Sequence, residues 1–387
     1  MSGPLAGVHV VDLTSVGMGP FATQTLGDMG AEVIKVETTD GDIFRYTTPS
    51  VHAGMSAAFV QLNRNKRSIV LDLKKADDLD VLKKLIARAD VLVYSIRPKA
   101  MRRLGLDYEA LKQTNARLIY CGAYGFSEKG PYAGRPAFDD IIQAMSGLAD
   151  VQGRGAAQGP AYVNSIVADK VSGLTTVNAI VMALYEREQS KQGQAIEVPM
   201  FETMVAFNLI EHMAGASFKD SAASMGYGRI LSKFRKPYRT LDGYIGLLPY
   251  TTEQWRRFFE VAGCDDEAKD PRFMDPSQRA VNIDEMYEIL EKIVAQQSTE
   301  YWVTKLQAAD IPVTAVRSLE DLLEDPHLKA IDFFQTAIHP TEGEIKMPGM
   351  AVQFSRTPGS IRRLAPQLGE HSAEIRSELK TDRRLSE

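Results

Sequence analysis

Three small residues near the start of the chain have the spacing of a nucleotide-binding turn. Gly17, Gly19 and Ala22 match G-x-G-x-x-A after an apolar run, and Glu37 lies twenty residues beyond Gly17. In dinucleotide-binding domains such glycines let the backbone approach a pyrophosphate, and the acid binds a ribose hydroxyl. An NAD-dependent oxidoreductase is therefore one hypothesis. Five residues separate the apolar run from Gly17, however, and an acid at a strand end is commonly just solvated.

Asp169 is the residue that could act as a nucleophile. The stretch "VADKVSGLTTVNAIVMALYERE" places it at, or one residue before, the first turn of a long apolar helix. An aspartate at this place commonly caps the helix, and sequence alone favours that interpretation. The alternative is a carboxylate that the helix dipole keeps ionised and that apolar neighbours leave poorly hydrated, so that it can attack a carbonyl.

Other nucleophiles and metal sites have little support in the sequence. The chain has no G-x-S-x-G, Walker A or H-E-x-x-H motif, and its six histidines are scattered. Cys121 lies in an apolar strand and is expected to be a packed thiol. The only other cysteine, Cys264, completes no zinc-type spacing, so we expect no metal. Two cysteines without a disulfide framework favour a reducing, cytoplasmic location.

Basic residues recur at expected loop positions. The clusters are "NRNKR" (Arg64, Lys66, Arg67), "IRPKAMRR" (Arg97, Lys99, Arg102, Arg103) and Arg135. Solvated surface is the simpler interpretation of any one cluster. The second cluster, however, directly follows an apolar strand, and ligands of open α/β sheets bind at the carboxyl ends of strands. A polyphosphate ligand is the sharper hypothesis.

The composition is that of a globular protein with little overall charge. In 387 residues, 45 Lys and Arg stand against 50 Asp and Glu, which gives no basic bias toward nucleic acid. We find no leader-like start and no run of about 18 apolar residues, and therefore expect no membrane association. The length suggests two domains, or one large domain with insertions.

The elements that must position these residues alternate between strand and helix over the first 200 residues. This order predicts an α/β fold with a mostly parallel sheet. The expected strands are Val8–Leu13, Glu32–Glu37, Ser68–Asp72, Val91–Tyr94, Leu118–Ala123 and Ala195–Val198, and the expected helices are Pro20–Met29, Ala76–Ala89, about Lys170–Glu188 and one from about Phe201.

The middle of the chain has a different composition. Residues 214–239 are rich in Gly, Ser and Lys and weakly periodic, which indicates a loop or connection. Residues 244–330 are mainly helical in pattern and predict a smaller second domain. The C-terminal tail has Pro and Gly at intervals and predicts an extended return that ends in a short helix.

Several stretches together resemble the family III CoA-transferases, the group of formyl-CoA and carnitine CoA-transferases that is related to alpha-methylacyl-CoA racemase. They run in family order from Pro4 to about Ile375, and the ordered set is highly specific. Among them are "GPFATQTLGDMGAEVIKVE", "LNRNKRSIVLDLK", "ADVLVYSIRPKAMRRLG", "GRPAFDDIIQAMSG", "VADKVSGLTTVNAIVMALYERE", "EDLLEDPHL" and "LGEH".

The resemblance implies a Rossmann-like large domain of residues 1–213 and 331–387 that binds CoA rather than NAD. It also implies a smaller α+β domain with its linkers, residues 214–330, and an obligate homodimer in which two chains interlock. Asp169 matches the family's catalytic aspartate. The implied reaction passes CoA from an acyl-CoA to a carboxylic acid through an aspartyl anhydride and an aspartyl-CoA thioester, with no metal and no cofactor beyond CoA as substrate.

The resemblance also suggests which residues contact the substrates. The expected CoA contacts are Ser15, Val16, Gly17, Met18, Thr38, Ser95, Ile96, Arg97, Lys99, Arg103 and Arg135. The expected acyl pocket contains Phe138 and Asp139, and Gly226 and Gly228 in "SMGYG" are the nearest match to a glycine-rich lid. Formyl-CoA transferase has other residues at Gly17 and Thr38, which puts oxalate specificity in doubt.

The racemase branch is the alternative function. Racemases pair the matching aspartate with a histidine at the position that is Phe138 here. Without that second acid/base, proton exchange on both faces of Cα lacks half of its groups. A transferase is therefore preferred to a racemase or epimerase of 2-methylacyl-CoA.

Overall fold

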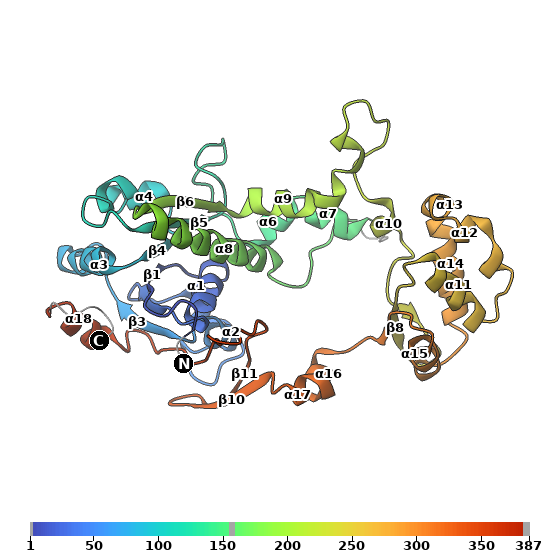
Figure 1. The fold of residues 1–387 in the computed structure, drawn as a ribbon. Helices are drawn as coiled ribbons and strands as arrows, with labels where there is room; N and C mark the ends of the chain where they lie inside the picture. Colours follow the sequence, from blue (N-terminus) through green and yellow to red (C-terminus); the bar gives the residue numbers. More distant parts are fainter. Residues whose placement is uncertain (1–2, 155–158, 382–387) are drawn as a thin grey trace. The chain divides into compact units, whose positions relative to one another are not determined.

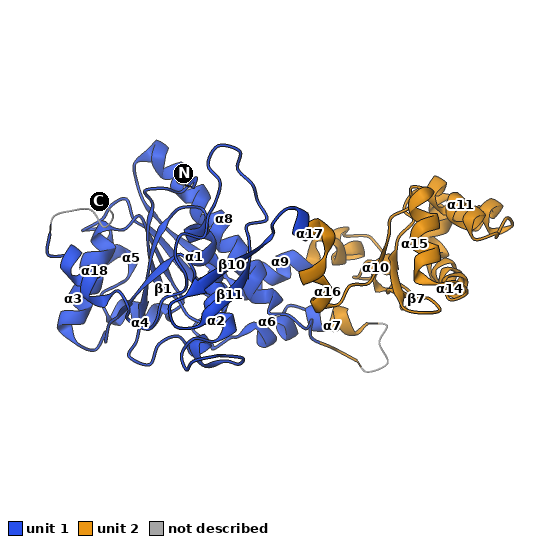
Figure 2. Cartoon of the chain, turned by 90° about the horizontal axis from the view of Figure 1, so that it is seen from below, with its two compact units in different colours: residues 1–149, 162–208, 329–387 blue, residues 150–161, 209–328 orange. Residues whose placement is uncertain are grey.

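The computed structural model describes residues 3–154 and 159–381, which fall into two compact units (Figures 1 and 2). Unit 1 contains residues 1–149, 162–208 and 329–387, and unit 2 contains residues 150–161 and 209–328. The division expected from the sequence, at 213/214 and 330/331, lies a few residues away from these limits and did not separate residues 150–161.

Unit 1 is built on one six-stranded sheet. Its strand order is β3-β2-β1-β4-β5-β6, and every neighbouring pair is parallel. The predicted parallel α/β sheet is confirmed. The elements of the first half of the chain are β1 (His9–Leu13), α1 (Met18–Asp28), β2 (Glu32–Glu37), η1 (Ile43–Tyr46), α2 (Ala57–Leu62), β3 (Lys66–Val70), α3 (Ala76–Arg88), β4 (Val91–Tyr94), α4 (Pro98–Arg103), α5 (Tyr108–Leu111), β5 (Ile119–Tyr124), α6 (Asp139–Met145), α7 (Leu148–Gly153), α8 (Val167–Ser190), β6 (Gln194–Pro199) and α9 (Met200–His212).

Both faces of this sheet are buried. Neighbouring residues of a strand point to opposite faces, so Val10 of β1 joins a core cluster with Leu26 of α1, whereas Val11 joins the opposite cluster with Leu85 of α3. Burial on both sides explains why the strands read as continuous apolar runs rather than as an alternating pattern.

Helix α8 is the longest helix and part of the core of unit 1. It packs against α1, β5 and β6, and Ala168, Ile180 and Ala183 are buried. By length and composition alone α8 could cross a membrane, and 44% of its apolar window is buried. A core helix passes the same test, and the expectation of no membrane association stays a prediction.

The C-terminal tail returns to unit 1 beside β3. The backbone N–H of His371 donates to the Ser68 carbonyl, and Arg67 forms ion pairs with Glu374 and Glu378 of α18 (Ser372–Glu378). Two antiparallel strands, β10 (Phe334–His339) and β11 (Gly343–Pro348), precede this return. The sequence pattern did not predict this hairpin, because its two strands carry exposed polar residues.

Unit 2 has its own core around an antiparallel sheet of order β7-β8-β9. Trp255, Phe258 and Trp302 are almost fully buried in it. The remaining elements of the chain are η2 (Ala214–Ser217), α10 (Gly228–Leu231), β7 (Tyr238–Arg239), β8 (Tyr244–Leu247), α11 (Thr252–Val261), η3 (Glu267–Lys269), α12 (Pro271–Met274), α13 (Pro276–Val281), α14 (Ile283–Val294), α15 (Thr299–Ala308), β9 (Val313–Ala315), α16 (Leu319–Glu324) and α17 (Pro326–Ala330).

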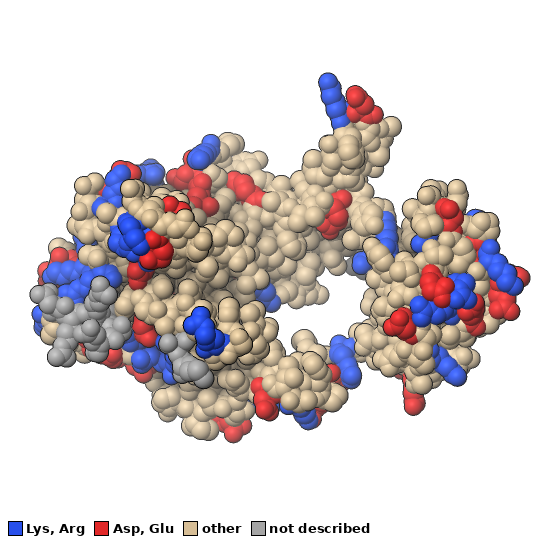
Figure 3. Space-filling model, in the orientation of Figure 1, with Lys and Arg blue, Asp and Glu red and all other residues tan. Residues whose placement is uncertain are grey.

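Charges of both signs are interspersed on the surface. On the face drawn in Figure 3, Lys and Arg side chains lie among Asp and Glu side chains, with wide uncharged areas between them. This distribution agrees with the near-neutral composition of the chain.

Candidate active site

A cavity opens at the carboxyl ends of β1 and β4, the two neighbouring strands at which the strand order reverses. Ligands of doubly wound sheets bind at this position. The cavity has a volume of about 240 Å³. Eight of the predicted site residues line it, namely Ser15, Val16, Met18, Ser95, Arg97, Arg135, Phe138 and Asp169.

Asp169 lies inside the first turn of α8, and its side chain does not cap the helix. The N-cap is Ile166, which precedes Asp169 by three residues, and no side chain caps this end of the helix. The capping interpretation, which sequence alone favoured, is therefore wrong. The Asp169 backbone N–H instead donates to Oδ2 of Asp139 at 3.0 Å, so a carboxylate at the start of α6 occupies the capping role.

The surroundings of the Asp169 carboxyl favour its neutral form. Burial, and next the negative charge of Asp139, raise the pKa of Asp169 from 3.8 to about 7, while the backbone amide of Met18 acts in the opposite direction. Contrary to the expectation that the helix start keeps Asp169 ionised, the pKa of this carboxyl is raised, because desolvation is the larger effect. A carboxylate with a pKa near neutral pH and little hydration is a stronger nucleophile than a fully solvated carboxylate.

Gly17 lies against the Asp169 carboxyl. A Cβ built on Gly17 would meet Oδ2 and Cγ of Asp169 at less than 3.0 Å. The backbone of Gly17 has an ordinary φ of −101°. Glycine is needed here for the close approach of the carboxylate and not for an unusual backbone conformation.

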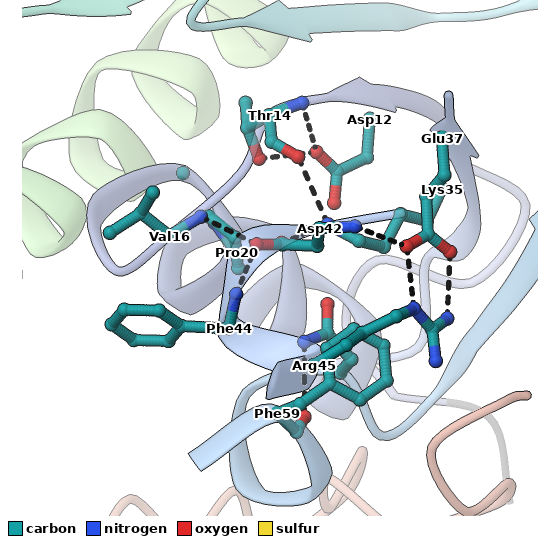
Figure 4. A network of polar contacts seen from close by, with 12 residues as sticks. Asp12, Thr14, Val16, Pro20, Lys35, Glu37, Asp42, Phe44, Arg45 and Phe59 are labelled. Carbon is teal, nitrogen blue, oxygen red and sulfur yellow. Dashed lines mark hydrogen bonds and ion pairs between the residues drawn. The ribbon is translucent and has the colours of Figure 1, made fainter. Parts of the chain in front are cut away.

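Two buried charges hold the turn between β1 and α1 (Figure 4). Oδ1 of Asp42 accepts the backbone N–H of Val16 at 3.0 Å, and Lys35 Nζ donates to the Thr14 carbonyl at 2.9 Å. Lys35 and Asp42 also pair with each other at 2.8 Å. Val16 has a φ of 70°, a left-handed conformation that is uncommon for a β-branched residue, so this turn depends on its neighbours for support.

Glu37, the acid of the dinucleotide fingerprint, is not available to a ribose. It is buried, and both of its oxygens bind Arg45, at 2.8 and 2.7 Å (Figure 4). Oε2 also accepts the hydroxyl of Ser68 at 2.7 Å. The expectation that Glu37 is solvated is wrong, and the fingerprint acid has a structural role.

The basic cluster "NRNKR" is also internal. Arg64 binds Asp28, Lys66 pairs with Asp12, and Arg67 reaches α18. All three side chains are buried. The expectation that they are solvated is wrong, and Lys66 and Arg67 belong to β3, which begins two residues earlier than predicted. Arg64 precedes this strand and lines the cavity that also contains Gly17 and Asp169.

The other predicted contacts do not line the cavity at the carboxyl ends of β1 and β4. Thr38 and Ile96 line a neighbouring cavity of about 360 Å³ that shares Ser15 and Ser95 with the first. Gly17 lines another cavity, of about 550 Å³, which also includes Asp169. The remaining predicted residues line none of these three. Lys99 and Arg103 are exposed on α4, Asp139 contacts the Asp169 amide, and Gly226 and Gly228 belong to unit 2.

Sequence reasoning missed the contribution of β5. Tyr124 and Gly125, at the carboxyl end of this strand, line the cavity, as does Met200 after β6. The rule that pointed to Ser95 after β4 applies equally to residues that follow β5 and β6. Cys121 of β5 is fully buried, and burial raises the pKa of its thiol to about 12, which confirms the packed thiol.

The described residues contain no group of three or more His, Cys, Asp or Glu side chains arranged to hold a metal ion. The site contains the buried carboxyl of Asp169, hydroxyl and backbone groups at the strand ends, and the guanidinium groups of Arg97 and Arg135. This set suits acyl chemistry on an anionic substrate.

Comparison with known proteins agrees with this chemistry. The family model described as CoA-transferase family III matches residues 5–372. A succinate–glutarate CoA-transferase of Agrobacterium fabrum is 31% identical, with 99% of this chain and 97% of that protein covered. An acetyl-CoA:oxalate CoA-transferase of Acetobacter aceti is 33% identical, with 97% and 96% covered. Among solved structures, a CAIB/BAIF family protein from Brucella suis is 31% identical with a TM-score of 0.83, covering 98% of this chain and 100% of that one.

Proposed function

The chain belongs to CoA-transferase family III, and from that premise we propose that it moves CoA from an acyl-CoA thioester to a carboxylic acid with Asp169 as the nucleophile. The observation that carries the proposal is the buried Asp169 carboxyl in the wall of the cavity at the ends of β1 and β4. Acyl exchange between carboxylates and thiolates needs a carboxylate in this kind of position.

In the proposed reaction, an Asp169 oxygen attacks the thioester carbonyl of the donor. The C–S bond breaks, and a mixed anhydride and CoA thiolate form. The thiolate then attacks the Asp169 carbonyl, which releases the donor acid and leaves an aspartyl-CoA thioester. The acceptor carboxylate reverses these steps and leaves as the new acyl-CoA. Each step exchanges a carboxylate for a thiolate, so no cofactor beyond CoA is needed.

The neighbouring groups have distinct proposed roles. The backbone of Ser15 to Met18, together with Ser95 and Ile96, contacts CoA at the strand ends. Arg97 and Arg135 bind phosphate or the acceptor carboxylate, because guanidinium groups match both oxyanions. More distant CoA contacts come from Lys99, Arg103 and Thr38. The acyl pocket is bordered by Phe138 and Asp139.

A covalent adduct on Asp169 tests the mechanism. Incubation with an acyl-CoA donor should leave a hydroxylamine-sensitive adduct on the peptide that contains Asp169, and Asp169→Ala should abolish both adduct and exchange. Asp77→Ala is the matched control, because Asp77 also lies in the first turn of a helix but is exposed. Undiminished exchange by Asp169→Ala would disprove the proposed nucleophile.

The names of relatives indicate which class of acceptor acid to test. The two curated relatives described above act, by their names, on succinate and glutarate and on oxalate. Dicarboxylates are therefore the first acceptors to test, with mass detection of each new thioester. If CoA is transferred to none of the dicarboxylates, monocarboxylates are the next acceptors to test.

The comparisons do not favour the racemase alternative, since these two relatives are named CoA-transferases. Phe138, at the position of the racemase histidine, cannot exchange protons. Deuterium should therefore not enter Cα of a 2-methylacyl-CoA when no acceptor acid is present. Wash-in at a rate comparable to CoA exchange would reverse this assignment.

We also propose a homodimer, with interlocked chains as the family resemblance implies. Four large apolar side chains on α8 are exposed in the single chain, namely Leu174, Val181, Met182 and Tyr185. A second copy that covers them would remove this apolar surface from water. Sedimentation equilibrium should give twice the chain mass of 42.8 kDa. The cytoplasmic location stays a prediction.

A further inference from the structure

A cavity in unit 2 has the features of a second anion site. Its volume is about 560 Å³, and all of its lining residues belong to unit 2. Small-molecule sites commonly have volumes of about 300–1,000 Å³. The walls combine three aromatic side chains, Tyr227, Tyr250 and Trp255, with two guanidinium groups, Arg229 and Arg279.

Both arginines are held in place by neutral partners. Nε of Arg229 donates to the hydroxyl of Tyr287 at 3.0 Å, and its guanidinium carbon lies 4.6 Å from the Tyr250 ring centroid. Nη1 of Arg279 donates to the Phe273 carbonyl at 2.8 Å and to Oγ1 of Thr252 at 3.1 Å. Anchored guanidinium groups lose little freedom when they bind a ligand.

Neither guanidinium has an acidic partner among the described residues. No carboxylate lies within 4.0 Å of either, whereas Arg272, on the neighbouring α12, pairs with both Asp270 and Glu285. The terminal nitrogens of Arg229, and Nε and Nη2 of Arg279, have no protein acceptor in the part of the chain that the structure describes. These donors are available to a ligand.

The two guanidinium groups are close enough to repel each other. Burial, and next the positive charge of Arg229, lower the pKa of Arg279, while the charge of Asp275 acts in the opposite direction. Asp275 itself caps α13 through the backbone N–H groups of Ser277 and Gln278. Asp284 on the cavity wall is exposed and leaves the lining with a net positive charge. An anion would relieve this repulsion.

We propose that this cavity binds a small molecule with an oxyanion group, either phosphate or carboxylate, on a planar or apolar body. The oxyanion lies between Arg229 and Arg279, and the body lies against Tyr227, Tyr250 and Trp255. Arginine forks recognise both oxyanions through paired hydrogen bonds. Tyrosine and tryptophan supply apolar contact area at a low entropic cost. None of the residues that line this cavity lines the Asp169 cavity, and the proposal does not rest on the proposed function.

Binding can be tested with three probes that share a phenyl ring. Phenyl phosphate and benzoate carry the two candidate oxyanions, and benzyl alcohol is uncharged. Each is titrated by calorimetry into the full chain in saturating CoA, which occupies the substrate site. We expect at least one anionic probe to bind saturably, and benzyl alcohol to bind at least about tenfold more weakly. The anion that binds more tightly identifies the ligand class.

Variants assign the binding to this cavity. Arg229→Gln and Arg279→Gln should each weaken anion binding at least about tenfold, because each removes charged donors. Arg272→Gln is the matched control and should bind as the unchanged protein does. Arg279→Lys keeps the charge but loses the fork, and should retain part of the affinity. Thermal unfolding of each variant verifies that unit 2 is folded.

Several results would overturn the proposal. It is wrong if neither anion binds, if benzyl alcohol binds as tightly as the anions, or if folded Arg229→Gln and Arg279→Gln variants bind with unchanged affinity. It is also wrong if saturating CoA abolishes the binding, since the two arginines would then serve the CoA site. None of these results depends on whether Asp169 is the nucleophile.

Discussion

Gly17 lies so close to the Asp169 carboxyl that no side chain fits between them. A Cβ on Gly17 would overlap Oδ2 of Asp169. The turn that leads into α1 and the first turn of α8 therefore meet at the Asp169 carboxyl, although 152 positions separate residues 17 and 169 in the sequence.

Gly17→Ala should move the Asp169 carboxyl without unfolding the protein. The φ of −101° allows alanine, so the effect comes from the overlap alone. We expect kcat to fall at least about tenfold, since small displacements at a reacting centre are costly, while KM for acyl-CoA changes less. Gly130→Ala is the control, because a Cβ there meets nothing within 4 Å. An unchanged kcat for Gly17→Ala would show that the carboxyl moves freely.

The rate of adduct formation should rise with pH through neutrality. The pKa of Asp169 is raised to about 7, so Asp169 is mostly protonated below that pH and mostly in its nucleophilic, ionised form above it. Asp139→Asn removes the second cause of the shift and should move the midpoint to lower pH, although burial keeps it above 3.8. Single-turnover rates from pH 5 to 9 measure both midpoints. A midpoint that Asp139→Asn leaves in place would contradict the role of Asp139.

The same raised pKa predicts a pH-dependent cost in stability. Between pH 3.8 and about 7, the unfolded chain has released the Asp169 proton and the folded chain has not, so the folded state loses stability as pH rises through this window. Asp169→Asn does not titrate. The difference in free energy of unfolding between this variant and the unchanged protein should therefore shift in favour of the variant from pH 4 to 7, by an amount on the order of 4 kcal/mol, and then level off. Equal advantages at pH 4 and 8 in chemical unfolding would contradict this.

Lys35→Met should destabilise the turn below the cavity. It leaves the buried Asp42 carboxylate unpaired and removes the bond to the Thr14 carbonyl, at an expected cost of about 3–5 kcal/mol. Lys35→Met with Asp42→Asn removes both charges and should recover part of this loss. Lys84→Met breaks an exposed pair with Asp80 and should cost less than about 1 kcal/mol. Similar losses for Lys35→Met and Lys84→Met would show that the buried pair supports nothing.

The sheet could be predicted from the sequence because its strands are buried on both faces. Val10, Val33, Val91 and Ile119 lie in apolar runs whose limits the pattern predicts to within one residue. Strand β3 was the exception. Its first residues, Lys66 and Arg67, look like surface charge, and only partners distant in sequence, Asp12 and Glu374, explain their burial.

The site could be predicted only in part. Ser15, Ser95 and Arg97 follow from the rule about strand ends, and Asp169 from its place near a helix start together with the family resemblance. The altered pKa of Asp169 does not follow, because it depends on Asp139 and on the depth of burial. The roles of Lys35 and Asp42 also depend on tertiary contacts, since a lysine inside a strand gives no sign that it supports a turn.

Helix α8 runs from the carboxyl ends of the strands in the sheet to their amino ends. Asp169 lies in its first turn at the carboxyl edge, and Arg187 in its last turn pairs with Asp90 at the amino edge. About five turns separate the two, so they share one side of the helix. Inserting a single residue between them would rotate Asp169 by about 100° relative to Arg187. During evolution this helix should therefore accept substitutions between Asp169 and Arg187, but no insertions or deletions there.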